Sequence, residues 1–151
     1  MAIPPLKTEK VSAHYDTQTR IAHIKYQGML SAEETISAYN WLADLIEAVG
    51  VDSLYGEIFD FRDVTEFAPD NLMKARSSSR RHNMRNNVRD LPVVMIVSSF
   101  YQEEILRGPM QNVEENKRKS IVWKMEEAQA FIDQWHSNLS TEDEQASDSA
   151  E

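Results

Sequence analysis

Apolar and polar residues alternate along two short segments near the start of the chain, residues 10–15 and 20–26. A period of two is typical of half-buried β-strands, and the polar residues 16–19 between them predict a hairpin turn. Pairing residue 16 with residue 19 gathers the apolar positions on one face of the hairpin. These positions are Val11, Ala13, Tyr15, Ala22, Ile24 and Tyr26. The other face carries Ser12, His14, Ile21 and His23, and we interpret its two histidines as exposed strand positions because no acidic residue joins them as a metal ligand.

The next periodic segment predicts an amphipathic helix that ends near residue 49. Ser31 followed by Glu34 is the sequence of a capping box, in which each side chain accepts a hydrogen bond from a free backbone donor of the first turn. Gly50 suits the position just after the helix C-terminus. Apolar residues recur at intervals of three and four and predict the buried stripe. They are Ile36, Tyr39, Leu42, Ala43, Ile46 and Val49, with Trp41 and Leu45 widening the stripe.

Residues 54–61 form an apolar run that suits a strand covered on both faces. The run gives way to charge at Asp60, Arg62 and Asp63, and we expect a loop from there to Asp70. We place Asp70 as the N-cap of a second helix over residues 70–87. Sites in open α/β sheets gather at the carboxyl ends of the strands, so this charged loop is the first candidate site.

The second predicted helix has a one-sided charge. Its basic residues include Lys74, Arg76, Arg80, Arg81 and Arg85, and it contains no acidic residue after Asp70. Like charges at intervals of four weaken a helix slightly, so we expect counter-charges or an anion nearby. An anion site, an acidic partner surface or the acidic C-terminal tail of the chain itself would supply them, and a solvated face balanced by neighbouring acids is the plainer alternative.

The remaining pattern predicts a strand over residues 91–98, a short helix over 100–107, a strand over 120–123 and a helix over 126–135, with residues 110–119 ambiguous. The order β-β-α-β-α-β-α-β-α predicts a single α/β domain with a mixed sheet of about five strands and helices packed on it. We place this domain at residues 10–136, after an N-terminal extension over 1–9. Residues 137–151 read as a disordered acidic tail, because the last ten residues carry five acids and no base.

The composition excludes several classes of site and partner but contains no motif that identifies a function. The 151 residues carry a net charge of −9 and no cysteine, which leaves neither a disulfide framework nor a thiol nucleophile. Residues 70–90 lack aromatic residues for base stacking, and an acidic chain is repelled by nucleic acid, so we expect no nucleic-acid partner. No segment has the length of a membrane span or the pattern of a signal peptide, and we expect a cytoplasmic protein. Neither a cofactor-binding motif nor a metal site is apparent.

Residues 58–72, Ile-Phe-Asp-Phe-Arg-Asp-Val-Thr-Glu-Phe-Ala-Pro-Asp-Asn-Leu, together with this element order, resemble the SpoIIAA-like superfamily. That superfamily groups STAS domains, which are anti-sigma-factor antagonists, with a lipid-binding Sec14-like branch. In STAS domains an apolar strand ends in Asp, a short turn with Val follows, and Asp-Ser-Ser-Gly-Leu opens the next helix. Asp60, Val64 and Leu72 match this motif, and residues 120–132 look like the closing strand and helix of uncharacterised bacterial members. Pro69 stands where the family carries its phosphorylatable serine, so the usual phospho-switch cannot operate at that residue.

The resemblance implies a non-enzymatic regulatory domain of STAS type that binds a protein partner. We expect its partner-binding or anion-binding residues to be Asp60, Arg62, Asp63, Asp70, Arg76, Arg80, Arg81 and Arg85. A homodimer is an alternative for the partner. A second hypothesis is a Sec14-like domain for a small apolar ligand or lipid, with a pocket lined by Met29, Trp41, Met73, Met84 and Met110. A third is an enzyme that uses the strand-end carboxylates Asp60 or Asp63.

Overall fold

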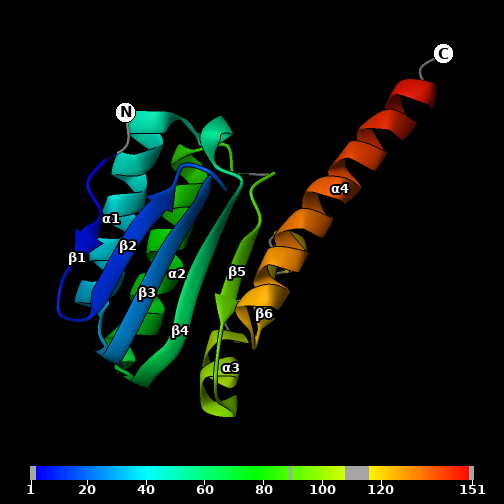
Figure 1. The fold of residues 1–151 in the computed structure, drawn as a ribbon. Coiled ribbons are helices and arrows are strands. Elements are labelled where there is room, and N and C mark those ends of the chain that lie inside the picture. Colours follow the sequence, from blue (N-terminus) through cyan, green and yellow to red (C-terminus); the bar gives the residue numbers. More distant parts are fainter. Residues whose placement is uncertain (1–2, 89, 108–115, 150–151) are drawn as a thin grey trace.

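A computed structural model describes residues 3–88, 90–107 and 116–149, which form one mixed sheet with helices on both faces (Figure 1). The strands are β1 (Leu6–Lys7), β2 (Val11–Asp16), β3 (Ile21–Leu30), β4 (Gly56–Phe67), β5 (Val93–Ile96) and β6 (Lys119–Val122). The helices are α1 (Ala32–Val49), α2 (Pro69–Arg85), α3 (Phe100–Arg107) and α4 (Met125–Ser149), with 3₁₀ turns η1 (Val51–Ser53) and η3 (Asn116–Arg118). The strands lie side by side in chain order. The pairs β1–β2 and β2–β3 are antiparallel and the remaining pairs are parallel. The predicted α/β domain with a mixed sheet is confirmed, with six strands in place of about five.

The additional strand, β1, comes from the segment that we predicted to be an extension outside the domain. Leu6 pairs with Ala13 in an antiparallel bridge. The indole N–H of Trp41 on α1 donates to the backbone oxygen of Pro4 at 3.0 Å. A two-residue strand is too short to produce an alternating pattern, which is why the sequence gave no sign of it. The described residues before residue 10 are therefore attached to the sheet edge and to α1.

The predicted hairpin has the expected faces but a different register. Val11 pairs with Tyr26 and Ala13 with Ile24, two positions away from the predicted partners. A shift of two residues preserves the face on which each side chain lies, so the apolar face is the predicted one. The loop is longer than expected because Asp16 Oδ1 accepts hydrogen bonds from the backbone N–H groups of residues 18 and 19, at 2.9 and 3.2 Å. The loop closes at Arg20, whose φ of 61° is in the left-handed region.

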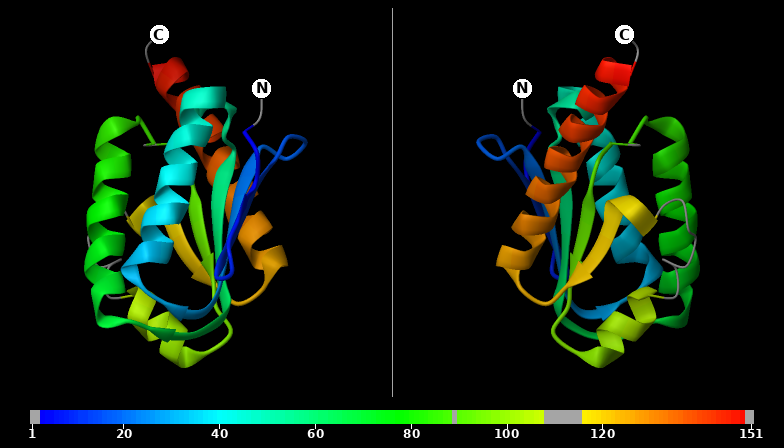
Figure 2. Two further views of the ribbon diagram at one scale, coloured as in Figure 1. Left: turned by 90° about the vertical axis from the view of Figure 1, so that its left-hand side faces the viewer. Right: turned by 90° about the vertical axis from the view of Figure 1, so that its right-hand side faces the viewer.

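The first helix, α1, has the predicted ends and a rotated buried face. Ser31 and Glu34 form the capping box, and Gly50 follows the last turn with a φ of 84°. The buried residues of α1 are Thr35, Ala38, Trp41, Leu42, Leu45 and Ile46. Ile36, which we predicted in the buried stripe, remains 38% exposed. The buried face is rotated away from α2, which lies beside α1 on the same side of the sheet (Figure 2), and toward the N-terminal segment that Trp41 contacts.

The strand β4 continues through the stretch that we predicted to be a loop. It pairs in parallel with β3 as far as Leu30–Phe67, with two register irregularities along the way. Between residues 61 and 67 every third residue is buried, so the alternation expected of a strand is absent there. The helix α2 then begins at Pro69, and Ala68 occupies the N-cap position. Asp70 lies in the first turn, and its prediction as the N-cap was wrong because proline takes the first helical position.

Two apolar clusters cover the sheet, which has α1 and α2 on one side and α4 on the other (Figure 2). The larger cluster packs the sheet against α1 and includes Leu106 of α3, and the smaller cluster packs the other face against α4. Ala128 and Ile132 of α4 are fully buried in the smaller cluster. Gly56 at the start of β4 makes this approach possible, because a Cβ atom there would lie 2.8 Å from Ile132 Cδ1. Within the described ranges, no helix is long and apolar enough to cross a membrane.

The last helix is longer than its apolar stripe. α4 ends at Ser149, so residues 137–149, which we predicted as part of a disordered tail, have helical backbone in the structure. Side-chain hydrogen bonds at intervals of four support the helix as it leaves the domain: Gln134 donates to Asn138 at 2.9 Å and Thr141 to the backbone oxygen of Ser137 at 3.1 Å. Helix propagation from a packed segment needs no new nucleus, which explains a helix where composition favours disorder.

Candidate functional site

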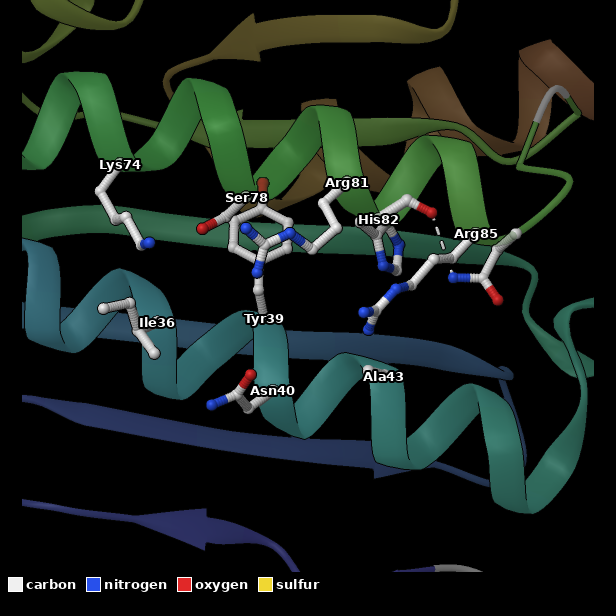
Figure 3. Close-up of a pocket in the computed structure, with 10 residues that line it drawn as sticks. Ile36, Tyr39, Asn40, Ala43, Lys74, Ser78, Arg81, His82 and Arg85 are labelled. Carbon is white, nitrogen blue, oxygen red and sulfur yellow. Dashed lines mark hydrogen bonds between the residues drawn. The ribbon is translucent and has the colours of Figure 1, made fainter.

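A groove runs between α1 and α2 on the face of the domain opposite α4, and we call it the basic groove. It encloses about 90 Å³. From α2 and its C-terminal cap it is lined by Lys74, Ser78, Arg81, His82, Arg85 and Asn86, and from α1 by Ile36, Tyr39, Asn40 and Ala43. Figure 3 shows the α2 side chains extending toward α1 across the groove. The groove therefore presents three cationic side chains over a partly apolar wall.

Helical periodicity explains why these residues share a groove. Positions 74, 78, 81, 82 and 85 recur at intervals of three and four, which places them along one side of α2. Positions 36, 39, 40 and 43 do the same on α1. Lys74, Arg81 and Arg85 form no ion pair with an acidic side chain in the part of the chain that the structure describes. Their charges are consequently available to an external anion.

His82 and Tyr39 form the floor of the groove above a buried carboxyl group. The His82 side chain is 7% exposed, and its ring meets the edge of the Tyr39 ring with centroids 5.8 Å apart. His82 Nε2 lies 3.5 Å from Oε1 of Glu57, whose side chain projects from β4 and is only 2% exposed. Nε2 is buried and finds no hydrogen-bond partner among the described residues. A buried carboxyl group and an imidazole thus lie beneath the cationic side chains and contact each other without a geometric hydrogen bond.

Polar contacts tie both ends of α2 to the rest of the domain. At its first turn, Asn71 Nδ2 donates to the Thr35 hydroxyl at 2.6 Å and to the backbone oxygen of Ser31 at 3.0 Å. Near its last turn, the buried guanidinium of Arg118 donates to Asn83 Oδ1 at 3.0 Å and to the backbone oxygen of Leu91 at 3.2 Å. Because α2 is held at both ends, the width of the groove is set before any ligand arrives.

The structure separates the predicted site residues into three groups. Arg81 and Arg85 line the basic groove. Arg76 and Arg80 lie on the same helix, are exposed and do not line it. Asp70 lies in the first turn of α2, and it too is absent from the lining. Arg76, Arg80 and Asp70 therefore lie on α2 outside the groove, and their part in partner or anion binding stays a prediction.

The strand-end acids form a third group, on β4, and each is held by a cation. Asp60 is 6% exposed and accepts two hydrogen bonds from the Arg62 guanidinium, from Nε at 3.0 Å and from a terminal nitrogen at 2.8 Å. Burial alone would raise the pKa of Asp60, but the hydrogen bonds and charge of Arg62 outweigh it and lower that pKa. Asp63 pairs with Lys25 at 3.2 Å on the surface. Neither carboxyl group lines the basic groove.

The residues proposed for an apolar ligand pocket do not come together. Met29, Met73 and Met84 are 45%, 80% and 81% exposed, whereas Trp41 is buried. Met110 lies outside the described residues. None of the described ones lines the basic groove. Over the described ranges, no group of three or more metal-ligating side chains is gathered in one place.

Sequence reasoning missed Glu57 and His82, although one signal pointed to the first. A glutamate inside an apolar run that is expected to be covered on both faces needs a buried partner. The partner could not be identified, because His82 is brought under the groove by the packing of α2 against α1 and the sheet. The hypothesis of a catalytic carboxylate was based instead on Asp60 and Asp63 at the end of the strand.

Two solved structures are similar to this chain in fold. The structure of the anti-sigma factor antagonist SpoIIAA in its unphosphorylated form is similar, with a TM-score of 0.52 and 9% sequence identity over 80% of this chain and 94% of that one. An uncharacterised protein of the DUF3478 family from Shewanella loihica PV-4, described as having a SpoIIAA-like fold, matches with a TM-score of 0.44 and 14% identity over 85% of this chain and 88% of that one. No protein-family model and no curated protein matches the sequence. The chain has a SpoIIAA-like, STAS-type fold, as the resemblance predicted.

Proposed function

We propose that this chain is a non-enzymatic regulatory domain that binds an acidic segment of a protein partner in the basic groove. The observation that carries the proposal is the set of three cationic side chains, Lys74, Arg81 and Arg85, that form no ion pair within the described ranges and lie along a groove whose width is fixed by contacts at both ends of α2. The fold is also that of a protein named as an anti-sigma factor antagonist. A binding role agrees with that likeness.

The size of the groove favours a side chain as its occupant. Pockets that enclose drug-sized ligands or lipids usually measure about 300–1,000 Å³. The basic groove, at about 90 Å³, admits one or two carboxylate side chains and leaves the rest of a peptide on the surface. Asn40 and Ser78 on the two walls offer hydrogen-bonding groups beside the cations. These features support an acidic peptide over the apolar ligand of a Sec14-like domain.

The proposed domain works without the phosphorylated serine of its structural class. Pro69 is the first residue of α2, where it has no hydroxyl group and no backbone N–H to offer. The strand-end acids support a non-enzymatic role, because Asp60 is engaged by Arg62 and Asp63 by Lys25. Regulation in this proposal therefore depends on whether the groove is occupied.

Fluorescence anisotropy with a labelled glutamate- and aspartate-rich peptide of about 12 residues tests the proposal, since a helix of that length spans about 18 Å. We expect wild-type protein to bind it, and Arg81→Glu/Arg85→Glu to raise its Kd by about tenfold or more, because two attractive contacts become repulsive. Arg76→Glu/Arg80→Glu is the matched control, with the same charge change on the same helix outside the groove. An equal loss of affinity in both double variants would show that net charge, not the groove, governs binding. Absence of binding by the wild type at low salt would refute the proposal.

A further inference from the structure

The end of α4 is an acidic helix that stands clear of the domain. Among the side chains that the structure describes, the last hydrogen bonds from α4 to the rest of the domain come from Trp135 and His136, to the backbone oxygens of Asp90 and Tyr55 at 3.0 and 2.7 Å. Beyond them, residues 137–149 continue the helix for about 20 Å at the usual rise per residue. Figure 1 shows these last turns projecting away from the sheet. The last ten residues of the chain contain five acids and no base.

This projecting end carries charge of the wrong sign for a helix C-terminus. The helix dipole places partial negative charge there, where cations stabilise and carboxylates destabilise. The last turn of α4 has no basic residue, whereas acidic residues lie at positions 142–144 and 148. Contact with an external cationic surface would relieve both the dipole and the mutual repulsion of the acids. A cationic surface such as the basic groove would therefore stabilise the end of α4.

The end of α4 cannot reach the groove of its own chain. The groove lies between α1 and α2 on one side of the sheet, whereas α4 packs on the opposite side (Figure 2). In the view of Figure 1 the projecting turns diverge from α1 and α2. Only another molecule can bring such an acidic helix into the groove. A second copy carries both halves of the contact, the groove and the helix.

We propose that the occupant of the basic groove is the acidic C-terminal end of α4, residues 137–149, from a second copy of this chain. The inference rests on the proposed function, since it names the partner of the same groove. Two copies related by a twofold axis exchange their helix ends reciprocally, so that each groove receives one end and the assembly closes as a dimer. The two contacts reinforce each other, because formation of the first makes the second intramolecular. Both are electrostatic and are screened by salt.

Sedimentation velocity on the full-length chain tests the inference. We expect a dimer at about 20 mM salt. It should dissociate at about 500 mM, because salt at that concentration screens the attraction between the acidic helix end and the cationic groove. Arg81→Glu/Arg85→Glu on the groove and Glu142→Lys/Glu144→Lys on the helix end should each raise the dimer Kd by about tenfold or more. Arg76→Glu/Arg80→Glu should leave the dimer Kd within about twofold. All four substitutions of groove and helix end in one chain should restore the dimer, which excludes misfolding as the cause of the loss.

The possible outcomes separate this inference from the proposed function. A monomeric wild type that still binds the acidic peptide in its groove would overturn the inference and leave the proposed function standing. A monomer that binds no acidic peptide would overturn both. A dimer that survives both double variants would also overturn the inference, since its interface would lie elsewhere. In the expected case, the Glu142→Lys/Glu144→Lys variant is monomeric and still binds the peptide, because its own groove is vacant.

Discussion

The buried pair beneath the basic groove yields a prediction for His82→Phe. Glu57 is 2% exposed, and within the described ranges the one basic side chain that it contacts is His82, whose Nε2 lies 3.5 Å from its carboxyl group. Phenylalanine keeps an aromatic ring against Tyr39, so the packing loss is small, but it leaves the carboxyl group buried without a partner. Removing one member of a buried pair costs about 3–5 kcal/mol. We take about 3 kcal/mol, the lower end, because the contact lacks hydrogen-bond geometry.

A double-mutant cycle measures this coupling. Glu57→Leu/His82→Phe replaces both members with apolar groups, a change that is often neutral or stabilising for a buried pair. We therefore expect the double variant to recover most of the loss seen in His82→Phe, with a coupling energy of about 2 kcal/mol. Urea unfolding, followed by tryptophan fluorescence and circular dichroism, gives the four free energies. Losses that simply add in the double variant would refute the coupling, and so would a His82→Phe protein as stable as the wild type.

Two further predictions concern the packing of α4 and the histidine pair of the hairpin. Gly56→Ala places a methyl group 2.8 Å from Ile132 Cδ1. We expect urea unfolding to show a free energy of unfolding lower by about 1–3 kcal/mol, and Ile132→Val to reverse part of that loss. An unchanged unfolding midpoint would contradict the close approach. Burial, together with the nearby charge of His14, lowers the pKa of His23 below its usual 6.5, so the unfolded chain takes up this proton first and stability is lost as pH falls below 6.5. Unfolding free energies measured between pH 7.5 and pH 5.5 should fall less in His23→Gln than in the wild type, and equal slopes would show that His23 is not responsible.

The candidate site was predictable only in part. Arg81 and Arg85 were found because a helix periodicity places basic residues in a row whatever the helix packs against. Arg76 and Arg80 do not line the groove with them, because they lie one or five positions away along the helix, which turns them by about 100° or 140° to other sides. A role for these residues and the strand-end acids in one binding surface stays a prediction. Glu57 and His82 were missed because they are distant in sequence and meet only after α2 packs on the sheet.

Local chemistry alone determined much of this fold. The capping box at Ser31, Gly50 at the end of α1, and the apolar runs of β4 and β5 act over a few residues, so sequence predicted them and their order. Tertiary structure decided what depends on distant partners. The alignment of β3 and β4 carries β4 through its charged stretch, and the sheet together with the N-terminal segment on Trp41 covers the buried face of α1. The groove exists for the same reason: its walls are two helices whose facing sides no local rule specifies, and only their packing on a common sheet brings the cations of one against the other.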